Sequence, residues 1–122
     1  MRHEESKIQR AAIKILDDYF RTSLCELIVN GHAPIMAASN EGKRSIVTGS
    51  LMKQQGLRKG FPDLFLHLKR KGYGGLCIEV KTEKGRFTKE QIAYLAHLKE
   101  QGYKVEICRT VQQIVDAVLA YI

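Results

Sequence analysis

Two short segments of the chain carry side chains whose chemistry is complementary. The first has Asp63 directly after a proline, and the second has Glu79 and Lys81 two residues apart. Carboxylate oxygens are ligands that hard divalent cations prefer, and a nearby ammonium can orient a water or offset developing negative charge. Two carboxylates that converge with a lysine therefore indicate metal-assisted chemistry of the kind that cleaves phosphodiesters, provided that the fold brings the segments together.

The spacing of these segments predicts a β-hairpin. Residues 64–68 and 76–81 are short apolar runs typical of strands, and the basic connection 69–75 between them is rich in turn-forming residues. We expect the two strands to pair with Leu68 opposite Leu76. This pairing would hold the acids of the two segments at the same end of the hairpin.

In that register Asp63 lies opposite Lys81, and Glu79 is the diagonal neighbour of Asp63 on the same face. Side chains alternate along a strand, so the acid and the lysine of the second strand should share one face. The opposite face would be apolar and carry Leu76, Ile78 and Val80. The alternative interpretation is a hairpin with an ion pair on its surface and no chemistry.

Pro62–Asp63 followed by Glu79–Lys81 resembles the PD-(D/E)XK nuclease signature. The longer pattern, Gly60–Leu64 with Gln91 and an upstream Glu5, resembles the VRR-NUC branch, the virus-type replication-repair nucleases. The resemblance extends over nearly the whole chain. It implies an α/β fold with a restriction-endonuclease-like core, in which a mixed β-sheet is flanked by α-helices.

The resemblance also implies the site. A bound Mg²⁺ or Mn²⁺ would be the cofactor, and no small-molecule cofactor is expected. The implied metal ligands are Asp63, Glu79, the Val80 backbone carbonyl and Glu5, and the implied catalytic residues are Asp63, Glu79, Lys81, Glu5 and Gln91.

The positions of Glu5 and Gln91 can also be examined without the resemblance. Residues 4–20 have the periodicity of an amphipathic helix, with Ile8, Ala11, Ala12, Ile15, Leu16 and Tyr19 as the apolar positions. Glu5 lies in the middle of that stripe, and an acid there needs a partner. Alternatively, Glu5 complements the positive end of the helix dipole. Gln91 lies three residues after Thr88, so it fits a capping box as well as a site role.

The remaining segments complete an alternating α/β order. Short strands are expected at 27–29 and 35–38, an exposed loop at 39–44, and a short helix within 49–56. A helix from Thr88 to Gln101 should carry Ile92, Leu95, Ala96 and either Leu98 or Lys99 on its periodic face. A strand at 103–108 and a last helix that opens with a second capping box at Thr110–Gln113 should follow. Cys25, Cys77 and Cys108 have no metal-type spacing, and the two in strands should be buried thiols.

Composition favours a polyanionic partner. The 122 residues suit a single domain, 1–122, and 20 Lys and Arg against 13 Asp and Glu give a net charge of +7. No apolar run is long enough to span a bilayer, so we expect no membrane partner and a cytoplasmic protein of a bacterium or a phage-infected cell. The basic residues nearest the predicted hairpin, which we expect to contact DNA phosphates, are Lys43, Arg44, Lys53, Arg58, Lys59 and Arg86.

These observations together predict a metal-dependent, structure-selective DNA endonuclease. The resemblance implies branched DNA as substrate, with four-way (Holliday) junctions prominent, and a homodimer would match the symmetry of a junction. Two alternatives stay open. One is a nuclease for flaps or nicked DNA, and the other is a non-catalytic DNA-binding module of the same fold.

Overall fold

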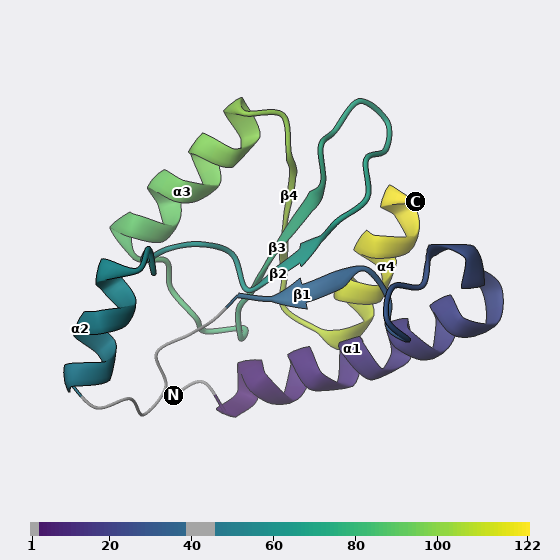
Figure 1. Cartoon of the computed structure of the whole chain (residues 1–122), viewed down its shortest axis with the longest axis horizontal. Helices are drawn as coiled ribbons and strands as arrows, with labels where there is room; N and C mark the ends of the chain where they lie inside the picture. The colour runs from purple at the N-terminus through teal and green to yellow at the C-terminus, as the bar shows by residue number, and fades with distance from the viewer. Residues whose placement is uncertain (1–2, 39–45) are drawn as a thin grey trace.

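The sheet at the centre of the protein has four strands in the order β1-β2-β3-β4. It is seen in a computed structural model that describes residues 3–38 and 46–122, without the side chains of residues 3 and 46–49 (Figure 1). The elements are α1 (His3–Ser23), a 3₁₀ turn η1 (Cys25–Leu27), β1 (Ile35–Ala37), α2 (Ile46–Gln54), β2 (Leu64–Leu66), β3 (Leu76–Val80), α3 (Lys89–Glu100), β4 (Lys104–Cys108) and α4 (Val111–Tyr121). The predicted mixed sheet flanked by helices is confirmed.

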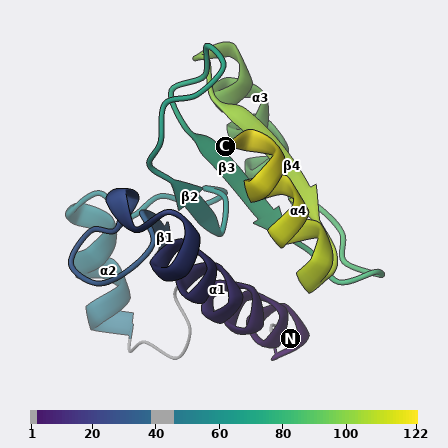
Figure 2. The same cartoon turned by 90° about the vertical axis from the view of Figure 1, so that its right-hand side faces the viewer.

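The strands pair in two modes. β1 with β2 and β2 with β3 are antiparallel, whereas β3 and β4 are parallel and are connected through α3. Helices α1 and α4 lie on one face of the sheet and α3 lies on the other, as the two views show (Figures 1 and 2). This three-layer arrangement buries the central strand β3 from both sides, and all five of its residues are buried.

The hydrophobic core fills the layer between the sheet and the α1–α4 pair. Alternate strand residues supply one side of it, as the period of two along a strand requires. The helices supply the other side through positions three or four residues apart. The core consists of Ala12, Leu16 and Phe20 of α1, Leu64, Leu66, Leu76, Ile78, Val80 and Cys108 of the sheet, and Ile114, Val118 and Tyr121 of α4, with Ala33 beside them.

Helix α1 is longer than predicted, and its buried stripe is rotated. Leu16 and Phe20 are fully buried, whereas Ile15 and Tyr19 are 45% and 39% exposed. The stripe centred on Leu16 therefore includes Glu5, as predicted, but leaves Ala11, Ile15 and Tyr19 at its border.

The predicted hairpin exists, but its register is wrong by two residues. Leu66, not Leu68, pairs with Leu76, and Leu64 pairs with Ile78. Continuing this register places Asp63 opposite Glu79 rather than opposite Lys81. A shift of two positions preserves the face of every side chain, whereas a shift of one would have reversed it. The prediction of the faces is therefore confirmed although that of the partners is not.

The connection between the strands explains the shift. It runs from 67 to 75 and turns tightly between Arg70 and Tyr73, which form an isolated bridge. Lys71 and Gly72 both have positive φ, 53° and 86°, as a two-residue primed turn requires. Gly75 then lets the Phe65 ring approach, because a Cβ there would lie 2.6 Å from a ring carbon.

The segment between α1 and β2 departs most from expectation. The predicted strand at 27–29 is wrong, because 25–27 form the turn η1 and Val29 makes a single bridge to His32. The strand at 35–38 is confirmed as β1. Helix α2 begins at Ile46, before the predicted range. The predicted loop 39–44, with Lys43 and Arg44, lies outside the described residues.

Both predicted helix caps occur, but they differ. Thr88 and Gln91 form the complete capping box of α3. Thr110 accepts a hydrogen bond from the Gln113 N–H, but the Gln113 side chain bonds the Arg109 N–H instead of completing a box. Ile92 and Ala96, predicted on the buried face of α3, are exposed, Ile92 by 58%, whereas Leu95 and Leu98 are buried.

The two strand cysteines are buried as predicted, and burial raises the pKa of the Cys77 and Cys108 thiols to about 11 each. Within the described ranges, no helix is both long and apolar enough to cross a membrane.

Candidate active site

The predicted site residues meet where β3 ends beside β4. Glu79 is the fourth residue of β3, and Lys81 directly follows the strand. The Lys81 N–H donates to the Cys108 carbonyl at 3.0 Å, so the parallel pairing continues past the last strand residue. In α/β sheets the carboxyl ends of parallel strands are where ligands bind. The location therefore suits a catalytic centre.

Asp63 is fixed from two sides at the start of β2. Its backbone carbonyl accepts the Ala38 N–H at 2.9 Å, and its Oδ2 accepts the Val80 N–H at 2.8 Å. Pro62 before it is fully buried, which holds the entry to the strand. Directly opposite residues of an antiparallel pair have Cβ atoms about 5 Å apart on one face. The register therefore places the Asp63 carboxylate beside that of Glu79.

Gly60 sets the distance between this segment and α3. It has a φ of +90°, and a Cβ at this position would lie 2.5 Å from the Glu90 carbonyl oxygen. A side chain would therefore clash with the backbone of the first turn of α3. The glycine at 60 is required both for its conformation and for this close approach.

Glu79 and Lys81 form a buried ion pair. Their side chains are 1% and 6% exposed, and Lys81 Nζ lies 3.8 Å from Glu79 Oε2. The same ammonium donates to the Arg86 carbonyl at 2.8 Å and to Gln91 Oε1 at 3.0 Å. It also lies 5.1 Å from the centre of the Phe87 ring. An ammonium has three hydrogens to donate, and three oxygen acceptors surround this one.

Gln91 links the pair to helix α3. Its Oε1 accepts from Lys81 Nζ and from the Thr88 N–H at 2.9 Å, and its Nε2 donates to Glu79 Oε2 at 3.1 Å. Gln91 thus completes the capping box and contacts both charged residues. The predicted capping box is confirmed, and the role of Gln91 in catalysis stays a prediction. The same amide that closes the helix cap also orients the Glu79 carboxylate.

Glu5 reaches the site from α1. It is 7% exposed, and its Oε2 accepts the Thr82 N–H at 3.4 Å. This places the acid against the peptide group that follows Lys81. The interpretation of Glu5 as a site residue therefore gains a geometric basis beyond an interaction with the helix dipole.

The predicted DNA contacts are distributed unevenly. Arg86 is exposed and its carbonyl touches Lys81, and Lys59 is exposed directly before Gly60. Lys53 and Arg58 are exposed on α2 and on the turn after it, where Arg58 Nη1 donates to the Lys53 carbonyl at 3.4 Å. Of the predicted residues that the structure describes, Arg86, through its carbonyl, and Lys59, through its neighbour Gly60, which packs on the first turn of α3, are the nearest to the site. Their contact with DNA stays a prediction.

Arg109 is a further residue at the site, and reasoning from the sequence missed it. It follows β4, so the parallel register places it beside Lys81, and its guanidinium contacts the Thr82 carbonyl. The available signal was its position. An arginine directly after the strand that pairs with the Glu–Val–Lys strand must lie next to that strand's carboxyl end.

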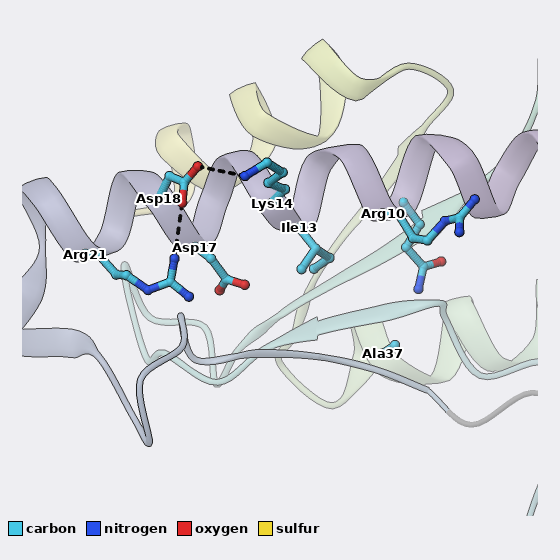
Figure 3. Close-up of a pocket in the computed structure, with 8 residues that line it drawn as sticks. Arg10, Ile13, Lys14, Asp17, Asp18, Arg21 and Ala37 are labelled. Atoms are coloured by element: carbon cyan, nitrogen blue, oxygen red, sulfur yellow. Dashed lines mark hydrogen bonds and ion pairs between the residues drawn. The ribbon is translucent and has the colours of Figure 1, made fainter.

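A groove of about 490 Å³ runs between α1 and β1, away from the Glu79–Lys81 pair (Figure 3). Two of its three cations are paired with one acid, because Asp18 bonds Arg21 at 3.1 Å and lies 3.6 Å from Lys14. Asp17 Oδ1 accepts the Ala33 N–H at 2.9 Å. Two acids among its cations leave little attraction for a polyanion, so the groove is a poor match for a DNA strand.

The residues present fit a hard divalent cation in part. Among residues 3–38 and 46–122, no three or more His, Cys, Asp or Glu side chains are grouped so that they could hold a metal ion. Mg²⁺, however, is usually bound by one or two carboxylates and keeps several waters for the rest of its octahedron. The Asp63 and Glu79 pair, two oxygen donors placed side by side by the strand register, meets that smaller requirement.

A mixed sheet flanked by helices, with Asp63, Glu79 and Lys81 at the carboxyl end of β3, is the arrangement that the nuclease resemblance implied. The chain belongs to the VRR-NUC domain family, whose model matches residues 3–112. A solved structure of a VRR_NUC domain protein has the same fold, with a TM-score of 0.75 over 98% of this chain and 88% of the other, at 20% identity. A Fanconi-associated nuclease 1 homolog of Arabidopsis thaliana is 43% identical over 53 residues. That match covers 41% of this chain and 6% of the relative's length.

Proposed function

We propose that this protein is a metal-dependent endonuclease that hydrolyses phosphodiester bonds in branched DNA. The observation that supports the proposal best is the buried Glu79–Lys81 pair at 3.8 Å, next to Asp63 at the carboxyl end of β3. Burying two charges is expensive, and a stabilising role is better served by apolar residues. A buried ion pair at this position is therefore better explained by chemistry than by a contribution to stability.

Asp63, Glu79 and the Val80 carbonyl are the groups that would hold Mg²⁺ or Mn²⁺. When bound, such an ion supplies a Lewis acid for the phosphate and an acidified water. Glu5, already hydrogen-bonded to the Thr82 N–H, is better placed to hold that ion's waters than to join the pair as a third ligand.

Lys81 acts as a positive charge rather than as a base in this proposal. Its ammonium donates to two oxygens and lies against Glu79, so it is arranged as a hydrogen-bond donor. To reach a phosphate oxygen it must exchange one of these acceptors, and Gln91 can release it while keeping its bond to the Thr88 N–H. Lys81 would then offset the charge that develops on the phosphate.

The choice of substrate rests on charge and symmetry. The chain carries a net charge of +7, and Arg86 and Lys59 are exposed beside the site. A two-fold homodimer would present two sites to the symmetric strands of a four-way junction. Light scattering after gel filtration should show a dimer at micromolar concentration. A monomer would remove the support for junctions and favour flaps or nicks.

The deciding experiment compares a labelled four-way junction, a linear duplex and a 5′ flap with the same arms, in Mg²⁺, Mn²⁺ or EDTA. We expect symmetric, metal-dependent nicks in the junction. Cutting of the flap alone would keep the chemistry and change the substrate. Tight binding with no cutting would support the non-catalytic module.

Asp63→Asn removes the charge of the Asp63 carboxylate with little disturbance of the structure, because an amide oxygen can still accept the Val80 N–H. Cleavage should fall at least about 100-fold, the scale seen when one charge-stabilising group is lost, with DNA binding retained. Asp17→Asn is the matched control, since Asp17 also accepts a backbone N–H, that of Ala33 at 2.9 Å, but lies in the groove between α1 and β1, about three helical turns along α1 from Glu5. An Asp63→Asn enzyme as fast as Asp17→Asn would exclude Asp63 from the site.

A further inference from the structure

We propose that Arg109 is a positioning residue, which aims Lys81 by anchoring the segment 82–87. Its Nη1 donates to the Thr82 carbonyl at 2.5 Å and lies 3.4 Å from the Glu83 carbonyl. The inference deepens the proposed nuclease function and rests on it. Arg109 reaches the backbone of the segment that follows Lys81, so it acts through that segment rather than on the DNA.

Thr82 is held on both sides of its backbone. Its N–H donates to Glu5 from α1 at 3.4 Å, and its carbonyl accepts from Arg109 and from the Gly85 N–H at 3.0 Å. One acid and one guanidinium from separate elements thus clamp the residue next to Lys81. A Cβ at Gly85 would lie 3.2 Å from Lys81 Cδ, so the folded segment also packs on the lysine stem.

The far end of the same segment supplies an acceptor to the ammonium. Lys81 Nζ donates to the Arg86 carbonyl at 2.8 Å and lies 5.1 Å from the Phe87 ring centre. The position of the Lys81 head group therefore depends on how the segment 82–87 is folded. Loss of the Arg109 contact would release the segment at Thr82. The Arg86 carbonyl and the Phe87 ring, which both contact the Lys81 ammonium, would then shift.

The arginine is itself oriented. The backbone N–H of Arg109 donates to Gln113 Oε1 at 2.6 Å, at the start of α4. Both carbonyl contacts come from Nη1, at the tip of a planar guanidinium whose orientation is fixed by its plane. A lysine ammonium can also donate to a carbonyl, but it is a compact charge on a flexible stem. Lysine at this position should therefore preserve part of the anchoring, and glutamine very little of it.

The test combines amide hydrogen exchange with kinetics on the four-way junction, for Arg109→Gln, Arg109→Lys and the control Arg70→Gln. Arg70 also donates to a backbone carbonyl, that of Lys69 at 2.9 Å, but in the connection 67–75 at the opposite end of β3. In Arg109→Gln the Gly85 amide should exchange about tenfold faster, with core amides unchanged. The kcat should fall about 10- to 100-fold with KM nearly constant, as misplacement of a catalytic group predicts.

Arg109→Lys should recover part of the kcat and part of the protection, and Arg70→Gln should match the wild type in both. A wild-type kcat in Arg109→Gln would overturn the proposal, as would faster exchange spread evenly over the whole chain. If the wild type cuts no DNA, the nuclease proposal fails. The exchange of Gly85 still decides whether Arg109 anchors the segment.

Discussion

The two faces of β3 are equally buried but are stabilised in different ways. Toward α1 and α4, Leu76, Ile78 and Val80 pack in the apolar core. Toward α3, Glu79 is 1% exposed and is held by Gln91 and Lys81 at defined distances. The apolar face needs volume and shape, which many residues supply, whereas the polar face needs particular partners for each buried group. Substitutions should therefore be tolerated very differently on the two faces.

The largest contrast should come from Lys81→Met on the polar face against Ile78→Val on the apolar face. Removing Lys81 leaves the Glu79 charge buried beside a neutral amide, which should lower the free energy of unfolding by about 3–5 kcal/mol. Ile78→Val removes one methylene and should lower it by about 0.5–1.5 kcal/mol. Urea denaturation measures both values.

A double-mutant cycle sharpens this comparison. Glu79→Gln combined with Lys81→Met removes both charges, so the loss should be smaller than the sum of the two single losses. An additive cycle, or a Lys81→Met loss no larger than that of Ile78→Val, would show that the pair is not what stabilises the polar face.

The next largest effect should follow from Gly60→Ala, with Gly56→Ala as its control. Both glycines have positive φ, +90° and +110°, so alanine is strained at each. A Cβ at 60 also meets the Glu90 carbonyl at 2.5 Å, whereas a Cβ at 56 has nothing within 4 Å. We expect losses of about 2–4 and about 1–2 kcal/mol respectively, measured by thermal unfolding. Equal losses would mean that the approach to α3 is relaxed in solution.

Much of the site could be predicted because its residues belong to regular elements. The period of two placed Glu79 and Lys81 on one face, and the helical period placed Glu5 toward the sheet. The register of Asp63 could not be predicted, because it depends on the turn at Lys71 and Gly72, where a non-glycine residue takes a positive φ. Local signals for that conformation are weak.

Arg109 illustrates the second limit of sequence reasoning. Its partner carbonyls lie 27 and 26 residues away, on the segment after a different strand. No periodicity within either segment reveals such a contact, which depends on the parallel pairing of β3 with β4. The exposure of Ile92 could not be predicted from the helical period either. Which residues of a helix are buried depends on the layer of the fold that packs against it.

The smallest effects should separate two helix caps with the same local chemistry. Thr88 and Thr110 each accept the N–H of the residue three positions later, at 3.1 and 3.0 Å. Replacing either with alanine should lower the free energy of unfolding by about 1 kcal/mol.

At α3, however, the cap also positions Gln91 against Glu79 and Lys81, so Thr88→Ala should in addition lower the kcat about threefold to tenfold. Thr110→Ala should lower the kcat less than Thr88→Ala does, at a temperature where both variants are folded, because the Thr110 cap holds Gln113, which contacts the Arg109 N–H and not the charged pair. Equal kcat values for the two variants would show that Gln91 holds the charged pair without help from its helix cap.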